Sequence, residues 1–301
     1  METRTLGRTG LTVSRLGVGL AEIGFELTAN DVAKAAEVLA AALDGGVTFL
    51  DTAACYDVSE ELIGRAASHR RDEFILATKC GHVTGGYRGE PWTRATVRDS
   101  IDRSLKRLRT DRLDIVQLHS CEVDVLERGE VIEEIERARD AGKTRFIGCS
   151  GDNEAALYAV RSGRFDTLQT SFNLLDQRAR FGLLGEAREQ EMGVIAKRPI
   201  ANGAWGARKS PSRYASDYFK RYKKMSEGGS LPGEPADRIA LALGFTLTHD
   251  DIDVAIVGTK NRAHMLSNIA LASGGIRVPD SIREELYARF DRYGAEWPQL
   301  T

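Results

Sequence analysis

The sequence contains few cysteines, and their spacing excludes a structural metal site built from thiolates. Only four occur in 301 residues, and no two of them form a Cys-x-x-Cys pair. Zinc frameworks need such paired ligands, and small disulfide-stapled secreted scaffolds need a much higher cysteine content. We therefore expect reduced thiols and no metal. The cysteines lie close to the ends of short apolar runs, at Cys55, Cys80, Cys121 and Cys149.

Long hydrophobic runs and an excess of one charge are also missing. No apolar stretch approaches the ~20 residues of a membrane span, and the first ten residues, METRTLGRTG, lack the apolar segment of a signal peptide. The formal net charge of −2 gives no electrostatic basis for binding nucleic acid or an anionic membrane. We expect a cytoplasmic protein that acts on a small molecule, and the sequence does not indicate an oligomeric state.

A third absence concerns cofactor binding. No Gly-x-Gly-x-x-Gly motif opens a strand–helix unit with an acidic residue ~20 positions further on. This excludes a dehydrogenase built on the Rossmann fold.

What the sequence does contain is an alternation of short β-like runs with amphipathic helical stretches between residues 15 and 272. This alternation is typical of βα units around a parallel sheet, and 301 residues fit one α/β barrel. The predicted strands are Leu16–Leu20, Thr48–Asp51, Phe74–Lys79, Leu113–His119, Thr144–Ser150, Thr167–Ser171, Gly193–Lys197 and Val254–Val257. The predicted helices are Asn30–Asp44, Thr93–Arg107, Val131–Ala141, Glu154–Ser162, Phe181–Glu191 and Pro235–Leu247. The pattern predicts a single (β/α)₈ TIM barrel domain over residues 1–301.

Three segments fall outside the eightfold pattern. Residues 1–14 carry a Gly-Arg-Thr-Gly turn between β-like runs, which predicts a β-hairpin across the barrel floor. Residues 201–235 show weak periodicity and a Gly/Pro cluster, which predicts a long loop after the seventh strand. Residues 279–301 predict a C-terminal helix and tail.

Four side chains suit carbonyl chemistry. Asp51, Lys79 and His119 stand at the downstream ends of successive apolar runs, and Tyr56 follows Asp51 in DTAACY. Side chains at the carboxyl ends of barrel strands converge on one mouth. A phenol titrates near ~10; we expect the lysine ammonium to lower this pKa, the aspartate to orient the lysine, and the histidine to hydrogen-bond a carbonyl oxygen. The set predicts protonation of an oxygen while a hydride reaches the attached carbon.

These residues carry a resemblance to the aldo-keto reductases, including bacterial members, that extends over nearly the whole chain. The most specific block is D-T-A-x-x-Y followed by S-E-x-x-x-G in FLDTAACYDVSEELIGRA. Weaker blocks are RTLGRTGLTVSRLGVGL, LHS, IGCSGDN, QTSFNLLDQ and IVGTKNRAHMLSN. The family's catalytic Asp, Tyr, Lys and His coincide with Asp51, Tyr56, Lys79 and His119. The resemblance implies a TIM barrel and nicotinamide-dependent carbonyl reduction.

A basic cluster follows the eighth predicted strand, where barrels often bind phosphate at a helix N-terminus. Lys260, Arg262 and His264 supply positive charge there. The alternative is a solvated basic helix start. With the tetrad present, the cluster predicts an adenosine-phosphate site and favours NADP(H), with NAD(H) left open. The expected contacts are Gly258, Thr259, Lys260, His264 and Asn268.

The resemblance adds cofactor positions and shows where this chain departs from the family. Ser150 and Gln169 match the residues that contact the nicotinamide carboxamide. The asparagine that usually follows this serine is Gly151 here. The amide contact of that asparagine is therefore either lost or made by Asp152 or Asn153. Lys197 stands where an aromatic ring usually stacks on the nicotinamide. Either it covers the ring, where its charge favours NADPH over NADP⁺, or it binds the pyrophosphate together with Arg198. Pro199 and Ile200 are further expected cofactor positions.

Two further departures lie near the adenosine. His264 stands in place of the arginine usual for the 2′-phosphate, and Ser267 in place of a glutamate near the adenine. Both weaken the implied preference for NADP(H) without removing it.

Large side chains on the expected mouth loops and tail either shape an apolar substrate pocket or pack as ordinary core residues. They are Ile23, Tyr87, Trp92 and Trp297. We expect reduction of an aldehyde or ketone. A sugar or secondary-alcohol dehydrogenase running in reverse, or a cofactor-sensing barrel with vestigial turnover, are the alternatives.

Overall fold

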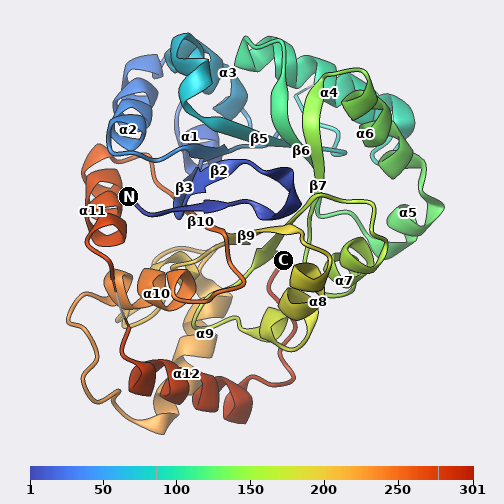
Figure 1. The fold of residues 1–301 in the computed structure, drawn as a ribbon. Helices are drawn as coiled ribbons and strands as arrows, with labels where there is room; N and C mark the ends of the chain where they lie inside the picture. Colours follow the sequence, from blue (N-terminus) through green and yellow to red (C-terminus); the bar gives the residue numbers. More distant parts are fainter. Residues whose placement is uncertain (86, 277) are drawn as a thin grey trace.

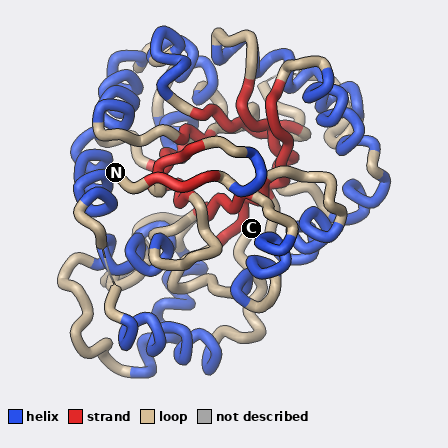
Figure 2. The backbone as a smooth tube through the Cα atoms, in the orientation of Figure 1, coloured by secondary structure: helices blue, strands red, loops and turns tan. Residues whose placement is uncertain are grey.

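The computed structural model describes residues 1–85, 87–276 and 278–301. Its central feature is a closed barrel of parallel strands in the order β10-β3-β4-β5-β6-β7-β8-β9. Figures 1 and 2 show the strands at the centre with helices around them. This confirms the predicted (β/α)₈ barrel. The barrel strands are β3 (Leu16–Gly19), β4 (Phe49–Asp51), β5 (Ile75–Cys80), β6 (Leu113–His119), β7 (Thr144–Ser150), β8 (Thr167–Ser171), β9 (Gly193–Lys197) and β10 (Val254–Gly258).

The predicted strand bounds agree closely with the structure. Four strands, β6 to β9, have the predicted ends, and the other four differ by one residue at one or both ends. Strands of a parallel barrel are covered on both faces and therefore form short continuous apolar runs, which are easy to recognise.

The helices agree less completely. They are α1 (Ala21–Glu26), α2 (Val32–Asp44), α3 (Ser59–Ala66), α4 (Arg94–Leu108), α5 (Val123–Arg128), α6 (Glu130–Asp140), α7 (Asn153–Arg161), α8 (Leu183–Glu189), α9 (Ser216–Met225), α10 (Arg238–Leu247), α11 (Arg262–Ser273) and α12 (Asp280–Tyr293). No helix was predicted at the positions of α1, α3, α5 or α9. Among the described residues, no helix is both long enough and apolar enough to cross a membrane.

Helix α9 lies inside the segment 201–235, which the sequence predicted to be a long loop. Its buried face consists of Tyr218, Arg221 and Met225. Arg221 is 7 % exposed and lies 3.3 Å from the buried carboxylate of Asp176. Because a paired arginine occupies the middle of the buried face, a search for apolar periodicity does not find this helix.

The predicted N-terminal hairpin is present as β1 (Thr3–Thr5) and β2 (Thr12–Ser14), which pair antiparallel. Leu6, Leu11 and Val13 form one buried cluster with inward-facing strand residues that include Phe49 and Val254. Gly7 has φ +46°, and a Cβ atom there would lie 2.2 Å from the backbone nitrogen of Gly193. The hairpin therefore fills the barrel floor and leaves the carboxyl ends of the strands open for a site.

Candidate functional site

The four tetrad candidates gather at the carboxyl ends of neighbouring strands. Asp51 ends β4, Lys79 lies next to the end of β5, His119 ends β6, and Tyr56 lies in the loop after β4. The β5–β6 register places Lys79 beside Gln117. Asp51 and Lys79 are each 2 % exposed, and Tyr56 and His119 are half-buried. The structure thus brings the four predicted residues together.

Asp51 and Lys79 form a buried ion pair. Lys79 Nζ donates to Asp51 Oδ2 at 2.6 Å and to the carbonyl oxygen of Thr52 at 2.9 Å. Gln169 Nε2 donates to the other carboxylate oxygen at 3.0 Å. Burial raises the pKa of the Asp51 carboxyl, and the Lys79 ammonium opposes that rise. The lysine is therefore held in one position by two acceptors.

The pKa of Tyr56 is shifted in the direction opposite to that expected from the sequence. Burial first, and then the Asp51 carboxylate, hold the pKa of the Tyr56 phenol well above its ordinary value, whereas Lys79 was expected to lower it. Lys79 Nζ lies 5.1 Å from the centroid of the Tyr56 ring, and its charge is already shared with Asp51. Desolvation of the phenolate exceeds the attraction of a lysine that is paired elsewhere. Tyr56 is consequently a fully protonated acid.

His119 is a neutral imidazole. Burial first, and then the Lys79 ammonium, lower the pKa of His119 well below its ordinary value. Its Nδ1 lies 3.2 Å from Cys55 Sγ. A neutral imidazole donates one hydrogen bond and accepts one, so His119 is able to donate to a carbonyl oxygen without giving up a proton.

A continuous series of aromatic rings borders the tetrad. The centroid of the Tyr56 ring lies 5.5 Å from those of Phe25 and His119. His82 continues the series, 5.2 Å from His119 and 4.9 Å from Trp92. Neither Phe25 nor His82 was predicted from the sequence to be a site residue. Phe25 is 61 % exposed. An exposed apolar side chain next to Tyr56 indicates that Phe25 belongs to the mouth.

The four substrate candidates are placed differently from one another. Trp92 belongs to the ring series. Tyr87 donates its hydroxyl to Asp99 of α4 at 2.8 Å, Ile23 is 0 % exposed within the core, and Trp297 packs against Phe290 at 5.9 Å. Of these four, the structure joins only Trp92 to the tetrad.

The β7–β9 side of the mouth holds the candidates for the carboxamide. Ser150 pairs with Gln169 in the β7–β8 register. The Oε1 atom of Gln169 is buried and has no hydrogen-bond partner within the described ranges. An unpartnered buried acceptor costs free energy unless a ligand supplies the donor, and the amide N–H₂ of a nicotinamide is such a donor.

Lys197 forms a second ion pair in the mouth. Its Nζ lies 2.8 Å from Asp152 Oδ2, with side-chain exposures of 15 % and 1 % respectively. Asp152 Oδ1 also accepts from the backbone N–H of Ser171 at 2.8 Å and from Thr170 Oγ1 at 3.1 Å. Asp152 is therefore engaged by protein groups, as is Asn153, whose Nδ2 donates to the carbonyl of Gln299 at 3.1 Å.

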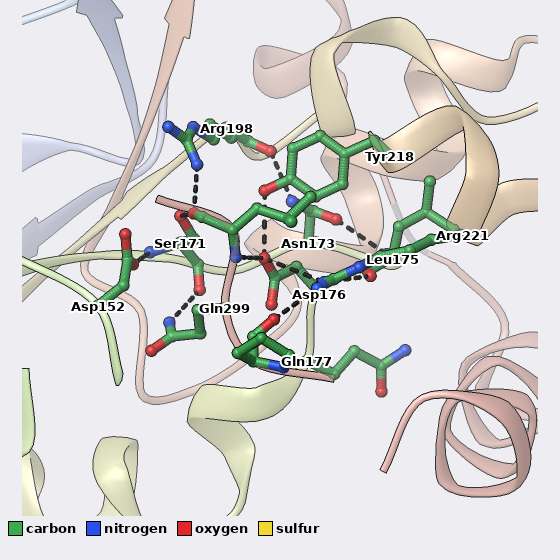
Figure 3. Close-up of polar contacts among 12 residues, drawn as sticks. Asp152, Ser171, Asn173, Leu175, Asp176, Gln177, Arg198, Tyr218, Arg221 and Gln299 are labelled. Atoms are coloured by element: carbon green, nitrogen blue, oxygen red, sulfur yellow. Dashed lines mark hydrogen bonds and ion pairs between the residues drawn. The ribbon is translucent and has the colours of Figure 1, made fainter. Parts of the chain in front are cut away.

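The C-terminal tail is hydrogen-bonded to the end of β8 and to the residue after β9, and Figure 3 shows Gln299 of the tail beside Ser171 of β8. Gln299 Nε2 donates to the carbonyl of Ser171 at 2.8 Å, and the backbone N–H of Leu300 donates to Asp176 Oδ2 at 2.9 Å. Burial raises the pKa of Asp176 to about 7. Arg198 donates to the Leu300 carbonyl and, at 2.8 Å, to the hydroxyl of Tyr214. Hydrogen bonds of Arg198 thus join the segment after β9 to the C-terminal tail.

Pro199 and Ile200, which were predicted to bind the cofactor, make contacts within the protein. The carbonyl of Pro199 accepts from Thr246 Oγ1 at 3.0 Å, and Ile200 packs against the core.

The predicted phosphate site lies at the start of α11. The Asn261 side chain accepts from the backbone N–H groups of Ala263 and His264, at 2.8 and 3.4 Å. Lys260 Nζ pairs with Glu26 at 2.5 Å. An anion must therefore compete with Asn261 for the helix N–H groups and with Glu26 for the lysine. The other candidates differ in exposure, with Gly258 and His264 exposed and Thr259 and Asn268 buried.

All four cysteines are free, and only Cys55 contacts a tetrad residue among the hydrogen bonds of the described residues. The side chains of Cys80, Cys121 and Cys149 are buried in the core. No cluster of metal-binding side chains occurs within residues 1–85, 87–276 and 278–301. The residues present fit a nicotinamide nucleotide: an unpartnered amide oxygen on Gln169 and positive charge after β9 and β10.

Comparisons with known proteins agree with this geometry. Residues 15–276 match the model of the aldo/keto reductase family. An uncharacterized oxidoreductase of Bacillus subtilis is 28 % identical to this chain, and the alignment covers 94 % of this chain and 95 % of the relative. L-galactose dehydrogenase of Arabidopsis thaliana is 29 % identical, covering 90 % and 88 %. The holo form of an aldo-keto reductase from Bacillus halodurans superposes with a TM-score of 0.82 at 26 % identity, covering 98 % and 97 %. The chain therefore belongs to the aldo/keto reductase family of NAD(P)H-dependent oxidoreductases.

Proposed function

We propose that this protein reduces an aldehyde or ketone to the alcohol, with Tyr56 as the proton donor and NADPH as the preferred cofactor. The observation that carries the proposal is the convergence of Tyr56, the Asp51–Lys79 ion pair and His119 on one barrel mouth. Each group supplies one part of a carbonyl reduction.

A nicotinamide cofactor, when bound, would supply a hydride to the carbonyl carbon. The residues that hold this cofactor are, in our proposal, Ser150, Gln169 and Lys197 at the nicotinamide end and the start of α11 at the adenosine end. The unpartnered Oε1 of Gln169 supports the first assignment. Lys260 supports the second because it places positive charge beside the helix N-terminus, and His264 lies in the first turn of the same helix.

Tyr56 holds its proton until negative charge develops on the substrate oxygen. Its raised pKa supports this role, because a phenol that ionised early would leave no acid for the reaction. The nearby Lys79 ammonium, fixed by Asp51, stabilises the phenolate that remains after transfer. A preoriented charge in a buried site stabilises such a state more strongly than water does.

His119 donates a hydrogen bond to the carbonyl oxygen and sets the direction from which the carbon is approached. Its lowered pKa supports a neutral donor, so the proton that is transferred comes from Tyr56. The exposed ring of Phe25 and the His82–Trp92 pair flank this position and favour substrates with apolar or CH-rich surfaces.

A sugar or secondary-alcohol dehydrogenase is a second candidate. The same residues catalyse the reverse reaction by microscopic reversibility, and one relative is named L-galactose dehydrogenase. Initial rates in both directions, with an aldehyde panel plus NADPH and an aldose panel plus NADP⁺, decide which direction dominates.

The test of the proposed acid is Tyr56→Phe. Loss of a general acid typically lowers the rate by ~10²–10⁴, while the retained ring keeps its contacts with Phe25 and His119. We expect NADPH oxidation with aldehydes to fall by this factor and the NADPH dissociation constant to stay near wild type. The matched control is Tyr158→Phe, which removes the same hydroxyl group from a tyrosine of helix α7 that is not part of the tetrad. Near-normal turnover by Tyr56→Phe would remove the proton donor from the proposal.

A further inference from the structure

We propose that Cys55 is a positioning residue that fixes the ring tautomer of His119, leaving the proton on Nε2. The inference rests on the proposed function, in which His119 donates a hydrogen bond to the substrate oxygen. The contact that carries it joins Cys55 Sγ to His119 Nδ1 at 3.2 Å. A sulfur–nitrogen separation of this length is a hydrogen bond, in which one of the two atoms must donate.

The surroundings decide which atom donates. Burial raises the pKa of the Cys55 thiol, so its sulfur carries a hydrogen. Burial also lowers the pKa of His119, so its ring carries only one N–H. The lone pair of an imidazole nitrogen is a good acceptor, whereas a neutral thiol sulfur is a weak one. The thiol therefore donates to Nδ1, and the single ring proton resides on Nε2.

The ring cannot easily reverse this arrangement by turning over. His119 ends β6, where its backbone is in register with Ser150 of β7. Its ring lies edge-to-face against the rings of Tyr56 and His82, with interplanar angles of 82° and 77°. Because turning the ring over would disturb both ring contacts and break the contact with Cys55, we infer that Nδ1 stays directed at Cys55 and that Nε2 is the nitrogen left for a substrate.

The tautomer matters because the two forms present opposite groups to a carbonyl oxygen. With the proton on Nε2, the ring offers a donor to the oxygen on which negative charge develops. With the proton on Nδ1, it offers a lone pair and repels that oxygen. The second nitrogen of a functional histidine is commonly oriented by a partner in this way. The unusual feature here is that the partner is a thiol adjacent in sequence to the proposed acid, Tyr56.

The experiment uses full-length protein labelled with ¹⁵N-histidine, with long-range ¹H–¹⁵N correlation spectra to report the tautomer directly. The five histidines are resolved by comparison with His119→Asn. We expect the wild type to show His119 protonated at Nε2. In Cys55→Ala, the Nδ1-protonated fraction should rise by roughly 2- to 10-fold, the range that one net hydrogen bond controls.

Kinetics complete the test. Cys55→Ala should lower kcat of carbonyl reduction in proportion to the Nε2-protonated fraction that it removes, and it should leave the NADPH dissociation constant unchanged. Cys55→Ser keeps a donor at the same position and should restore both the tautomer and most of kcat. Cys121→Ala removes a buried thiol that has no hydrogen bond to the tetrad among the described residues, and it controls for a general loss of packing.

The outcomes separate the inference from the proposed function. A Cys55→Ala spectrum with the wild-type tautomer, or a Cys55→Ser protein that behaves as Cys55→Ala, overturns the role of the thiol while the reductase assignment stands. A wild-type protein inactive in both directions overturns the proposed function, while the tautomer spectrum still decides what Cys55 does to His119.

Discussion

Replacing Lys79 with methionine should reduce both activity and stability, and the stability loss should depend on pH. The lysine is the close cationic partner of Asp51, at 2.6 Å, and both side chains are 2 % exposed. Without it, the carboxylate keeps only amide donors, Gln169 at 3.0 Å and Gln117 at 3.5 Å. Breaking a buried ion pair from one side typically costs about 3–5 kcal/mol of unfolding free energy, and we expect a loss in this range at pH 8.

The pH dependence follows from the pKa of Asp51. Burial already raises this pKa while Lys79 opposes the rise, so the Lys79→Met change must raise it further. Between the unfolded value of ~3.9 and the raised folded value, the folded protein binds more protons than the unfolded chain. Stability in that window falls as pH increases. The penalty of Lys79→Met should therefore be smaller at pH 5 than at pH 8, because lower pH favours the protonated Asp51 carboxyl, which needs no cationic partner.

Urea unfolding at pH 5, 6.5 and 8 measures this penalty. The control is Lys79→Met combined with Asp51→Asn, which removes the buried charge; it should regain most of the stability and lose the added pH dependence. Carbonyl reduction should stay low in both proteins, by ~10²–10⁴ relative to wild type, because neither assists Tyr56. A Lys79→Met protein whose stability loss is the same at pH 5 and pH 8 would refute the assigned cause.

Three shorter predictions concern the cofactor and the tail. Lys260→Ala and His264→Ala should each weaken NADPH several-fold more than NADH in fluorescence titrations; equal losses would place the 2′-phosphate elsewhere. Lys197→Met leaves the Asp152 carboxylate unpaired, so it should tighten NADP⁺ relative to NADPH, whereas parallel weakening of both forms would favour a pyrophosphate contact. Since burial raises the pKa of Asp176 to about 7, Asp176→Asn should flatten the fall in unfolding free energy between pH ~4 and that value; an unchanged slope in urea titrations would contradict this.

The barrel was predictable from the sequence because its strands are buried on both faces. Runs such as residues 113–119 and 193–197 therefore stand out against amphipathic neighbours, and their ends agree with β6 and β9. Helix α9 was not predictable in the same way. Its buried face contains Arg221, whose charge is matched by Asp176 from a loop 45 positions earlier in the numbering. A tertiary partner of this kind leaves no periodic signal.

The proximity of the proposed catalytic residues was predictable, because the carboxyl ends of barrel strands meet at one mouth and order along the chain therefore gives closeness in space. The electrostatic directions were not. The sequence places Lys79 near Tyr56 but does not reveal that Asp51 and Thr52 already hold the ammonium. It also gives no measure of the burial that raises the pKa of Tyr56. The contact of Cys55 with His119 likewise joins residues 64 positions apart.

Lys197 departs from the family pattern, and its ion pair with Asp152 changes what this departure means for the cofactor. Taken alone, a lysine at the usual stacking position introduces a positive charge into the mouth. In the folded protein this charge lies 2.8 Å from an aspartate that is 1 % exposed, and that aspartate is oriented by Ser171 and Thr170. The pair is neutral overall, so its effect on a nearby ring is that of a dipole rather than of a full charge, and it falls off faster with distance. The two positions should therefore be coupled. Replacing both, with Lys197→Met and Asp152→Asn, should change cofactor affinity and stability less than either single change, because each single change leaves a buried charge without its partner.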